Sequence, residues 1–273
     1  MLARYKRFEE MRRKIDAGEF VLGTGCSTAS PVSMEILGYS GFDFVICDTE
    51  VLMVNPETLE NMIRAAEATG TIPMVKLKGN DPHFIQDALN AGAPAIKVPH
   101  ITSADDLKRA MDSTYFAPRG NRGLCPVSRA NQYSQGRMED LINWTNQHAM
   151  VIPIIEDREA IDNIDEIMSV EGVSVYDVGP VDLAHSYGVP PDLGFSNPEV
   201  DAALCRVLES AHKYGKKVMT TPFFGAGAVN LPELIRERII KRGVHLIFYR
   251  SDASLMREGI KQAFHLKEIF NGK

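Results

Sequence analysis

Residues 44–77 read FVICDTEVLMVNPETLENMIRAAEATGTIPMVKL, and this stretch decides the fold. It contains apolar runs at Phe44–Asp48 and Ile72–Leu77, separated by a segment, Pro56–Ala68, whose apolar residues recur at spacings of three and four. Short apolar runs predict buried strands, and the intervening spacing predicts an amphipathic helix. Asn55 followed by proline is a typical helix start. The stretch therefore predicts two parallel strands joined by a helical crossover.

The same alternation continues along the whole chain. Helical patterns recur at Asp81–Ala91, Ala104–Ser113 and Asn197–Tyr214, and residues 1–20 also read as an amphipathic helix. Eight nearly all-apolar strands favour a closed barrel over an open doubly wound sheet, and about 250 residues suffice for such a barrel. We therefore expect an α/β protein in which residues 1–273 form a single (β/α)8 TIM-barrel domain with an N-terminal helix. The strands are expected at Phe20–Thr24, Phe44–Asp48, Ile72–Leu77, Ala95–Pro99, Val151–Glu156, Val173–Val178, Lys217–Thr221 and Val244–Phe248.

Composition and charge exclude several classes of protein. The net charge of −6 provides no field for holding nucleic acid or an anionic membrane. No stretch approaches the ~20 apolar residues of a membrane span, and the N-terminus has no apolar signal region. The four cysteines show no CxxC spacing, so we expect reduced thiols. These features predict a cytoplasmic protein, and they do not exclude an anionic substrate, which needs only local positive charge.

Polar residues follow the predicted strands at the end where a barrel carries its active site. Glu156 and Asp182 follow neighbouring strands, so their carboxylates can converge on one point. Two carboxylates suit Mg²⁺ or Mn²⁺, which can polarise a carbonyl. Two other interpretations remain open: Glu156 caps the next helix, and Asp182 pairs with a surface base.

Two basic residues are further candidates. Lys76 ends the third strand, where it can bind a carboxylate or a developing enolate, form a Schiff base, or pair with Asp48 or Glu50. Arg122 lies in Arg119-Gly120-Asn121-Arg122-Gly123, which can hold an anion or form a plain surface turn. Other residues that follow strands or occupy loops and can reach the mouth are His100, His185, Phe223, Phe224, Leu124 and Tyr133.

Several separated motifs resemble the HpcH/HpaI aldolase family, which are metal-dependent lyases of the pyruvate/phosphoenolpyruvate barrel superfamily. The resemblance runs from about Gly23 to about residue 265. Its motifs occur in the family's order: GFDFVICDTE at 41–50, AGA at 91–93 with Val-Pro at 98–99, PRGNRG at 118–123, Ile-Glu at 155–156 and VGPVDLA at 178–184.

The resemblance implies that Glu156 and Asp182 are the ligands of a divalent metal, Mg²⁺ or Mn²⁺. It also implies that the backbone of Gly179, Pro180 and Val181 holds the carboxylate of a 2-oxo acid such as pyruvate or oxaloacetate. The implied activity is that of a carbon–carbon lyase that works through a metal-stabilised enolate. The family is typically hexameric, with the last helix, here Leu255–Phe270, packed on a neighbouring subunit.

The sequence departs from the family pattern at three positions. Val51 stands where the family usually has a histidine that transfers a proton. Lys76 stands where the family usually has an arginine at the end of the third strand, and Ile154 stands where it commonly has a glutamine. Lysine keeps the charge but loses the bidentate geometry of arginine. We therefore expect Lys76 to stabilise the enolate and Asp48, Glu50, His100 or a metal-bound water to carry the proton. The alternatives are an acyl-CoA condensation, a Schiff-base mechanism at Lys76, and a non-catalytic barrel that binds a 2-oxo acid.

Overall fold

The computed structural model describes residues 3–225, 228–229 and 231–270 and has eight parallel strands closed into a barrel in the order β1 to β8. The predicted (β/α)8 fold with an N-terminal helix is confirmed, and every strand lies within three residues of its expected position. The strands are β1 Val21–Cys26, β2 Phe44–Asp48, β3 Ile72–Lys76, β4 Ala95–Val98, β5 Met150–Ile155, β6 Val175–Val178, β7 Lys217–Thr220 and β8 Leu246–Ser251.

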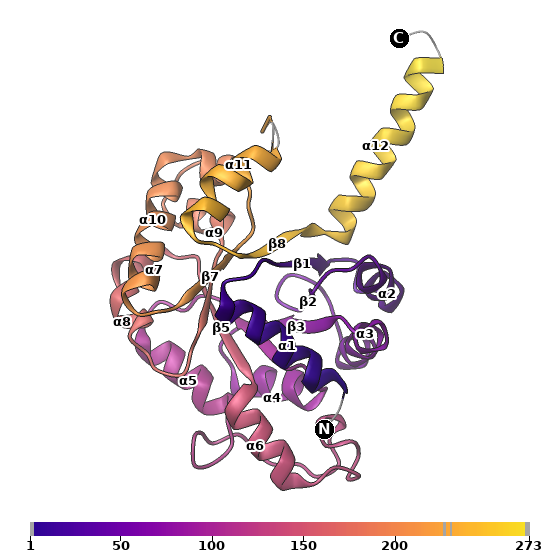
Figure 1. Ribbon diagram of the computed structural model, residues 1–273, viewed down its shortest axis with the longest axis vertical. Helices are drawn as coiled ribbons and strands as arrows, with labels where there is room; N and C mark the ends of the chain where they lie inside the picture. Colours follow the sequence, from indigo (N-terminus) through magenta and orange to yellow (C-terminus); the bar gives the residue numbers. More distant parts are fainter. Residues whose placement is uncertain (1–2, 226–227, 230, 271–273) are drawn as a thin grey trace.

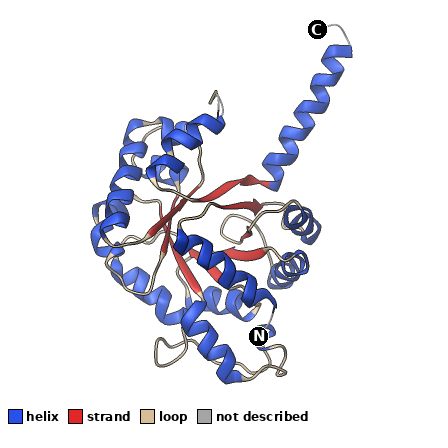
Figure 2. Ribbon diagram, in the orientation of Figure 1, coloured by secondary structure: helices blue, strands red, loops and turns tan. Residues whose placement is uncertain are grey.

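Helices surround the strands on the outside of the barrel (Figures 1 and 2). Several begin at side-chain caps: Asn55, Asp81 and Asn197 each accept an N–H of the first turn, and proline follows each of them. The surrounding helices are α2 Pro31–Tyr39, α3 Pro56–Thr69, α4 Pro82–Asn90, α5 Ala104–Thr114, α6 Met138–His148, α7 Arg158–Asp162, α8 Ile164–Met168, α9 Pro180–Ser186, α10 Pro198–Lys213 and α11 Leu231–Arg238; short 3₁₀ helices are η1 Arg129–Asn131, η2 Pro191–Ser196 and η3 Ile240–Arg242. No helix among the described residues is long and apolar enough to cross a bilayer.

The N-terminal helix α1 (Ala3–Ala17) covers the end of the barrel at which the strands begin (Figure 1). Its own residues Phe8 and Ile15 are buried. Lys14 forms an ion pair of 2.9 Å with Asp43, which directly precedes β2. Arg12 donates to the carbonyl of His148, just before β5. The opposite end, where the strands finish, is therefore the end available for a ligand.

The barrel interior is packed with apolar side chains from the strands. Phe44 fills space beside Gly23, because any Cβ at Gly23 would lie 2.0 Å from the Phe44 ring. Val45, Ile46 and Cys47 continue β2 as a fully or almost fully buried run. This packing fixes the strand ends that carry the polar residues.

The last helix, α12 (Asp252–Phe270), follows β8 directly and projects away from the barrel (Figure 1). The Asp252 carboxylate accepts the backbone N–H of Ser27 at 2.7 Å, that of Thr28 at 3.3 Å and that of Ala253 at 2.8 Å. One carboxylate thus joins the end of β1 to the root of α12. Beyond this root, large apolar side chains of α12 are exposed: Met256, Ile260, Phe264, Leu266, Ile269 and Phe270.

Candidate active site

A cavity of about 290 Å³ opens where the strands end. The ends of β2 and β3 contribute Asp48 and Lys76, the residue after β5 is Glu156, and the turn after β6 contributes Gly179 to Asp182. The structure thus brings Asp48 and Asp182, which are 134 positions apart in the sequence, to one cavity. A larger cavity of about 430 Å³ lies outside the barrel beside α3 and α4. We place the site in the barrel mouth because the ionisable side chains converge there.

Glu156 is the buried centre of this cavity. Its Oε1 accepts the backbone N–H of His100 at 3.1 Å, so it does not cap the next helix. Gly179 allows the next strand end to approach, because a Cβ there would lie 2.9 Å from Glu156 Oε2. Burial raises the pKa of Glu156 to about 7, and nearby Asp182 adds to this rise, while Lys76 and His100 oppose it. The positive charge and hydrogen bond near the Glu156 carboxylate therefore do not fully offset the cost of burying its negative charge.

The charge around the cavity fits a bound cation. The lining contains four carboxylates against two ammonium groups, and no ion pair links Asp182 to a lysine or arginine within the described ranges. An excess of carboxylate oxygens is the donor set that hard divalent cations prefer. These charged lining residues are Asp48, Glu156, Asp177, Asp182, Lys76 and Lys97.

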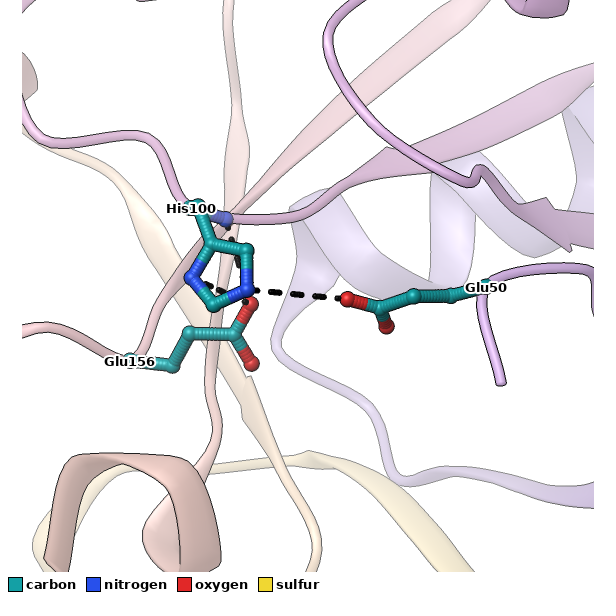
Figure 3. Close-up of side chains that lie close together, drawn as sticks. All are labelled: Glu50, His100 and Glu156. Carbon is teal, nitrogen blue, oxygen red and sulfur yellow. Dashed lines mark hydrogen bonds and ion pairs between the residues drawn. The ribbon is translucent and has the colours of Figure 1, made fainter. Parts of the chain in front are cut away.

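His100 lies over Glu156 at the mouth (Figure 3). Its φ of 52° is left-handed, and this turn leaves its N–H bonded to Glu156 and its ring between two carboxylates. The ring Nδ1 is 2.9 Å from Asp157 Oδ2, and Nε2 is 3.7 Å from Glu50 Oε1. Burial lowers the pKa of His100, but Asp157, Glu156 and Glu50 outweigh burial and raise it. Glu50, His100 and Glu156 also offer three ligand atoms within 4.8 Å of one another.

Lys76 forms an ion pair with Glu50, one of the partners that the sequence left open. The loop that carries Glu50 is shaped by Asp48, whose Oδ1 accepts the N–H of Glu50 at 2.9 Å and of Val51 at 3.2 Å. Burial lowers the pKa of Lys76, but Glu156, Glu50 and Asp48 together raise it above its usual value. A Schiff base requires the neutral amine, so this environment disfavours that mechanism and favours a fixed positive charge.

Arg122, whose loop the sequence predicts to hold an anion or to form a surface turn, does not line this cavity. Its side chain is buried on the outer side of the barrel, donating to Asn90 Oδ1 at 2.8 Å and lying 4.6 Å from the centre of the Phe116 ring. Burial lowers the pKa of Arg122 to about 10. Its loop follows α5 at the end where the strands begin, because Arg122 N donates to the carbonyl of Tyr115 directly after that helix.

The remaining predicted residues divide into two groups. Ile154 and Phe223 line the cavity, whereas Val51 is 72% exposed in the bend after β2. Residues expected near the mouth but absent from the lining are His185, Phe224, Leu124 and Tyr133.

Sequence reasoning missed Lys97 and Asp177, which line the cavity from within β4 and β6. The available signal was a charged residue in the middle of each of two apolar strands.

Comparison with known proteins identifies the family. The model of the HpcH/HpaI aldolase/citrate lyase family matches residues 25–232. A 5-keto-4-deoxy-D-glucarate aldolase of Enterobacter sp. (strain 638) is 28% identical over 254 residues, 93% of this chain and 94% of the relative. A solved HpcH/HpaI aldolase/citrate lyase family protein of Burkholderia cenocepacia J2315 is 27% identical, with a TM-score of 0.84 over 95% of this chain and 98% of that one. The solved citrate synthase SbnG is also 27% identical, with a TM-score of 0.82 over 96% and 98% of the two chains. The chain described here belongs to the HpcH/HpaI aldolase/citrate lyase family.

Proposed function

We propose that the protein is a carbon–carbon lyase of the aldolase type that acts on a 2-oxo acid with the help of Mg²⁺ or Mn²⁺. The observation that carries this proposal is the convergence of Glu156, Asp182 and Lys76 on one cavity. Family membership and the aldolase name of the relative point to the same reaction class. They give no support to a non-catalytic binding barrel.

Glu156 and Asp182 are the residues that would hold the cation, with Glu50 and His100 near enough to complete or adjust its surroundings. A divalent cation supplies Lewis-acid chemistry, polarising the substrate carbonyl and stabilising the enolate. Lys76, which forms an ion pair with Glu50, adds a fixed positive charge to the cavity that contains Glu156 and Asp182. The backbone of Gly179, Pro180 and Val181 forms the wall that orients the substrate carboxylate.

Glu50 and His100 are the groups placed to move a proton at the mouth. Glu50 Oε1 lies 3.7 Å from His100 Nε2, and Asp157 holds the other ring nitrogen. Val51, at the position of the family's histidine, has no group that can carry a proton. Asp48 acts through Glu50 as a positioning residue, because its carboxylate fixes the backbone of the loop. General acid–base help of this kind contributes about 10²–10⁴ in rate.

The assembly proposed for this enzyme is a hexamer in which α12 packs on a neighbouring subunit. Its support is the exposed apolar surface of α12, which no other described element of the same chain covers. Exposed apolar patches of this kind mark contact surfaces.

The test needs no knowledge of the second substrate. Proton–deuterium exchange at the methyl group of pyruvate is followed by NMR in D₂O, with Mg²⁺ or Mn²⁺ and again after EDTA treatment. We expect exchange that depends on the cation. Exchange that survives exhaustive EDTA treatment would contradict the metal mechanism, and an absence of exchange with every cation would contradict enolisation of pyruvate.

A condensation is the second candidate, because the chain resembles a solved citrate synthase over nearly its whole length. In this reaction an oxaloacetate-like acid accepts a carbon unit from an acyl-CoA. Release of free coenzyme A thiol from acetyl-CoA, dependent on oxaloacetate, would select this candidate. Cation-dependent exchange of pyruvate without thiol release would select the aldolase.

A further inference from the structure

A buried ion pair forms part of the inner wall of the cavity. Lys97 Nζ lies 2.8 Å from Asp177 Oδ2, and the two residues are only 2% and 4% exposed. Lys97 belongs to β4 and Asp177 to β6, so the pair spans the inner face of β5, which lies between these two strands. Both residues line the cavity that contains Glu156.

The pair leaves hydrogen-bonding capacity unused. Asp177 Oδ1 is buried and has no hydrogen-bond partner in the described part of the chain. A lysine ammonium has three N–H groups. Within the described part of the chain, the contacts of Lys97 Nζ are the carboxylate of Asp177 and the Phe248 ring, whose centre is 5.3 Å away. A buried unsatisfied acceptor costs about 1–3 kcal/mol, so its presence in a cavity wall requires a reason.

Stability alone does not supply that reason. Replacing a buried ion pair by apolar residues of similar volume is often neutral or stabilising. A pair that served packing would also be closed on itself, whereas here one buried acceptor has no partner among the described residues and both residues line a cavity. The arrangement is that of a recognition site for a group that both donates and accepts a hydrogen bond.

The depth of the pair identifies the part of the substrate that reaches it. Asp177 pairs in register with Ile154, and Glu156 lies two residues further along β5. Two residues of a strand span about 7 Å, so the pair lies one layer of side chains deeper than the proposed cation ligands. A carbon chain that leaves the carbonyl and enters the barrel reaches this layer after three or four bonds.

We propose that Lys97 and Asp177 recognise a hydroxyl group on the carbon chain of the substrate. The hydroxyl donates to the Asp177 carboxylate and accepts from Lys97 Nζ, so the acceptor and the donor of the pair are used at once. A second carboxylate would be repelled by Asp177, and an alkyl chain would leave the pair without partners. This inference rests on the proposed function, because it assumes that the carbonyl end lies at Glu156 and Asp182.

The test compares two ligands of matched size that retro-aldol cleavage cannot consume. 5-Hydroxy-2-oxopentanoate carries the hydroxyl, and 2-oxohexanoate has a methyl group in its place. Affinities for the full chain are measured by calorimetry with Mg²⁺ present, and pyruvate is titrated in parallel. We expect the hydroxylated ligand to bind at least about tenfold more tightly, because the apolar one leaves buried polar groups unpaired.

Two variants connect that preference to the pair. Lys97→Met combined with Asp177→Leu removes both charges, and it should abolish the preference while pyruvate still binds in the presence of Mg²⁺. Lys97→Gln combined with Asp177→Asn keeps neutral hydrogen-bonding groups and should retain part of the preference, and it serves if the first variant fails to fold. The matched control is Arg129→Met with Glu67→Leu, which removes an ion pair of 2.6 Å outside the cavity and should leave the preference unchanged.

Each outcome has a definite meaning. Equal affinity of wild-type protein for the two ligands, or a preference that survives removal of the pair, would overturn the inference and assign the pair a packing role. In either case cation-dependent binding of pyruvate would leave the proposed function intact. Failure of pyruvate to bind with any divalent cation would overturn the proposed function, and this inference with it.

Discussion

Single substitutions of the carboxylates that follow β5 and β6 are expected to reduce activity and metal binding the most. Glu156→Gln and Asp182→Asn each remove one charge from the proposed cation site while keeping the size of the side chain. We expect each to reduce cation-dependent exchange of pyruvate by at least about 10²-fold and to weaken binding of Mg²⁺ or Mn²⁺. NMR exchange measures the first effect and calorimetric titration of the metal measures the second.

Glu159→Gln is the matched control for these substitutions. Glu159 lies three residues after Glu156 but is exposed on α7, so its change should leave both measurements at the wild-type level. Wild-type exchange in Glu156→Gln would remove Glu156 from the site.

The raised pKa of Glu156 predicts a pH dependence of the metal-free protein. The pKa rises from its ordinary value of 4.5 to about 7, so between these values the folded chain binds a proton that the unfolded chain releases. This contribution to stability is fully present below the lower value and is lost as the pH rises through the higher one. In EDTA, urea unfolding should show that the free energy of unfolding of the wild-type protein falls between about pH 5.5 and about pH 8, and that it falls less in Glu156→Gln. Equal declines in both proteins would contradict the prediction.

Val51 marks the missing proton carrier of the family. Val51→His places an imidazole in the exposed bend whose N–H groups bond to Asp48. We expect exchange of pyruvate to rise by about 10²-fold, within the usual range for acid–base help. Met53→His is the control, because Met53 is fully exposed in the same loop and should give no increase. An equal rise in both variants would show a general effect of added imidazole.

The position of a site residue could be predicted from the sequence where the residue follows the end of a strand. It could not be predicted where tertiary packing determines the position of a loop. Glu156, Asp182, Lys76 and Asp48 converge because parallel strands in a barrel finish at one end. Arg122 lies outside the cavity, because the path of its long loop depends on contacts with α4 and with the end of α5 that no local pattern encodes.

Gly179 allows the turn after β6 to pack closely against Glu156, the residue after β5. It joins β6 to α9 with an ordinary φ of −90°, so the reason for glycine is space: a Cβ would lie 2.9 Å from Glu156 Oε2 and 3.1 Å from Glu156 Cβ. Gly179→Ala should therefore displace the Glu156 carboxylate, weaken cation binding by about tenfold and cost about 1–3 kcal/mol of stability. Metal titration and urea unfolding measure these effects.

Gly79→Ala is the control for that substitution. A Cβ at Gly79 meets nothing within 4 Å, so this variant should change neither quantity. Wild-type metal affinity in Gly179→Ala would show that Glu156 moves freely.

Strands and helices were more predictable than their ends. Each strand from β1 to β8 contains a short apolar run, and each of α3, α4 and α10 has a capping residue and proline at its start, signals that are local in the sequence. The limits of β8 shifted by two to three residues, from Val244–Phe248 to Leu246–Ser251, because its last residues pair with β1 rather than continuing an apolar pattern.

At the scale of the whole molecule, α12 predicts association between subunits. Met256, Ile260 and Phe264 follow one another at spacings of four, so they form one exposed stripe of the helix. Ile260→Glu combined with Phe264→Glu should convert an oligomer into monomers with a folded barrel, as sedimentation and circular dichroism can show. Gln262→Glu adds a charge to the same helix outside the stripe and should leave the assembly unchanged. A wild-type protein that sediments as a monomer would contradict the proposal.

The carboxylate of Asp252 gives this association a further meaning. It ties the root of α12 to the backbone at the end of β1, at the seam where the last strand meets the first. Only a chain that has closed this seam holds α12 at a fixed angle. In the proposed hexamer, assembly therefore depends on completed folding of each chain. A chain in which β8 has not paired with β1 does not hold α12 in the direction that the neighbouring subunit binds, and such a chain does not enter the complex.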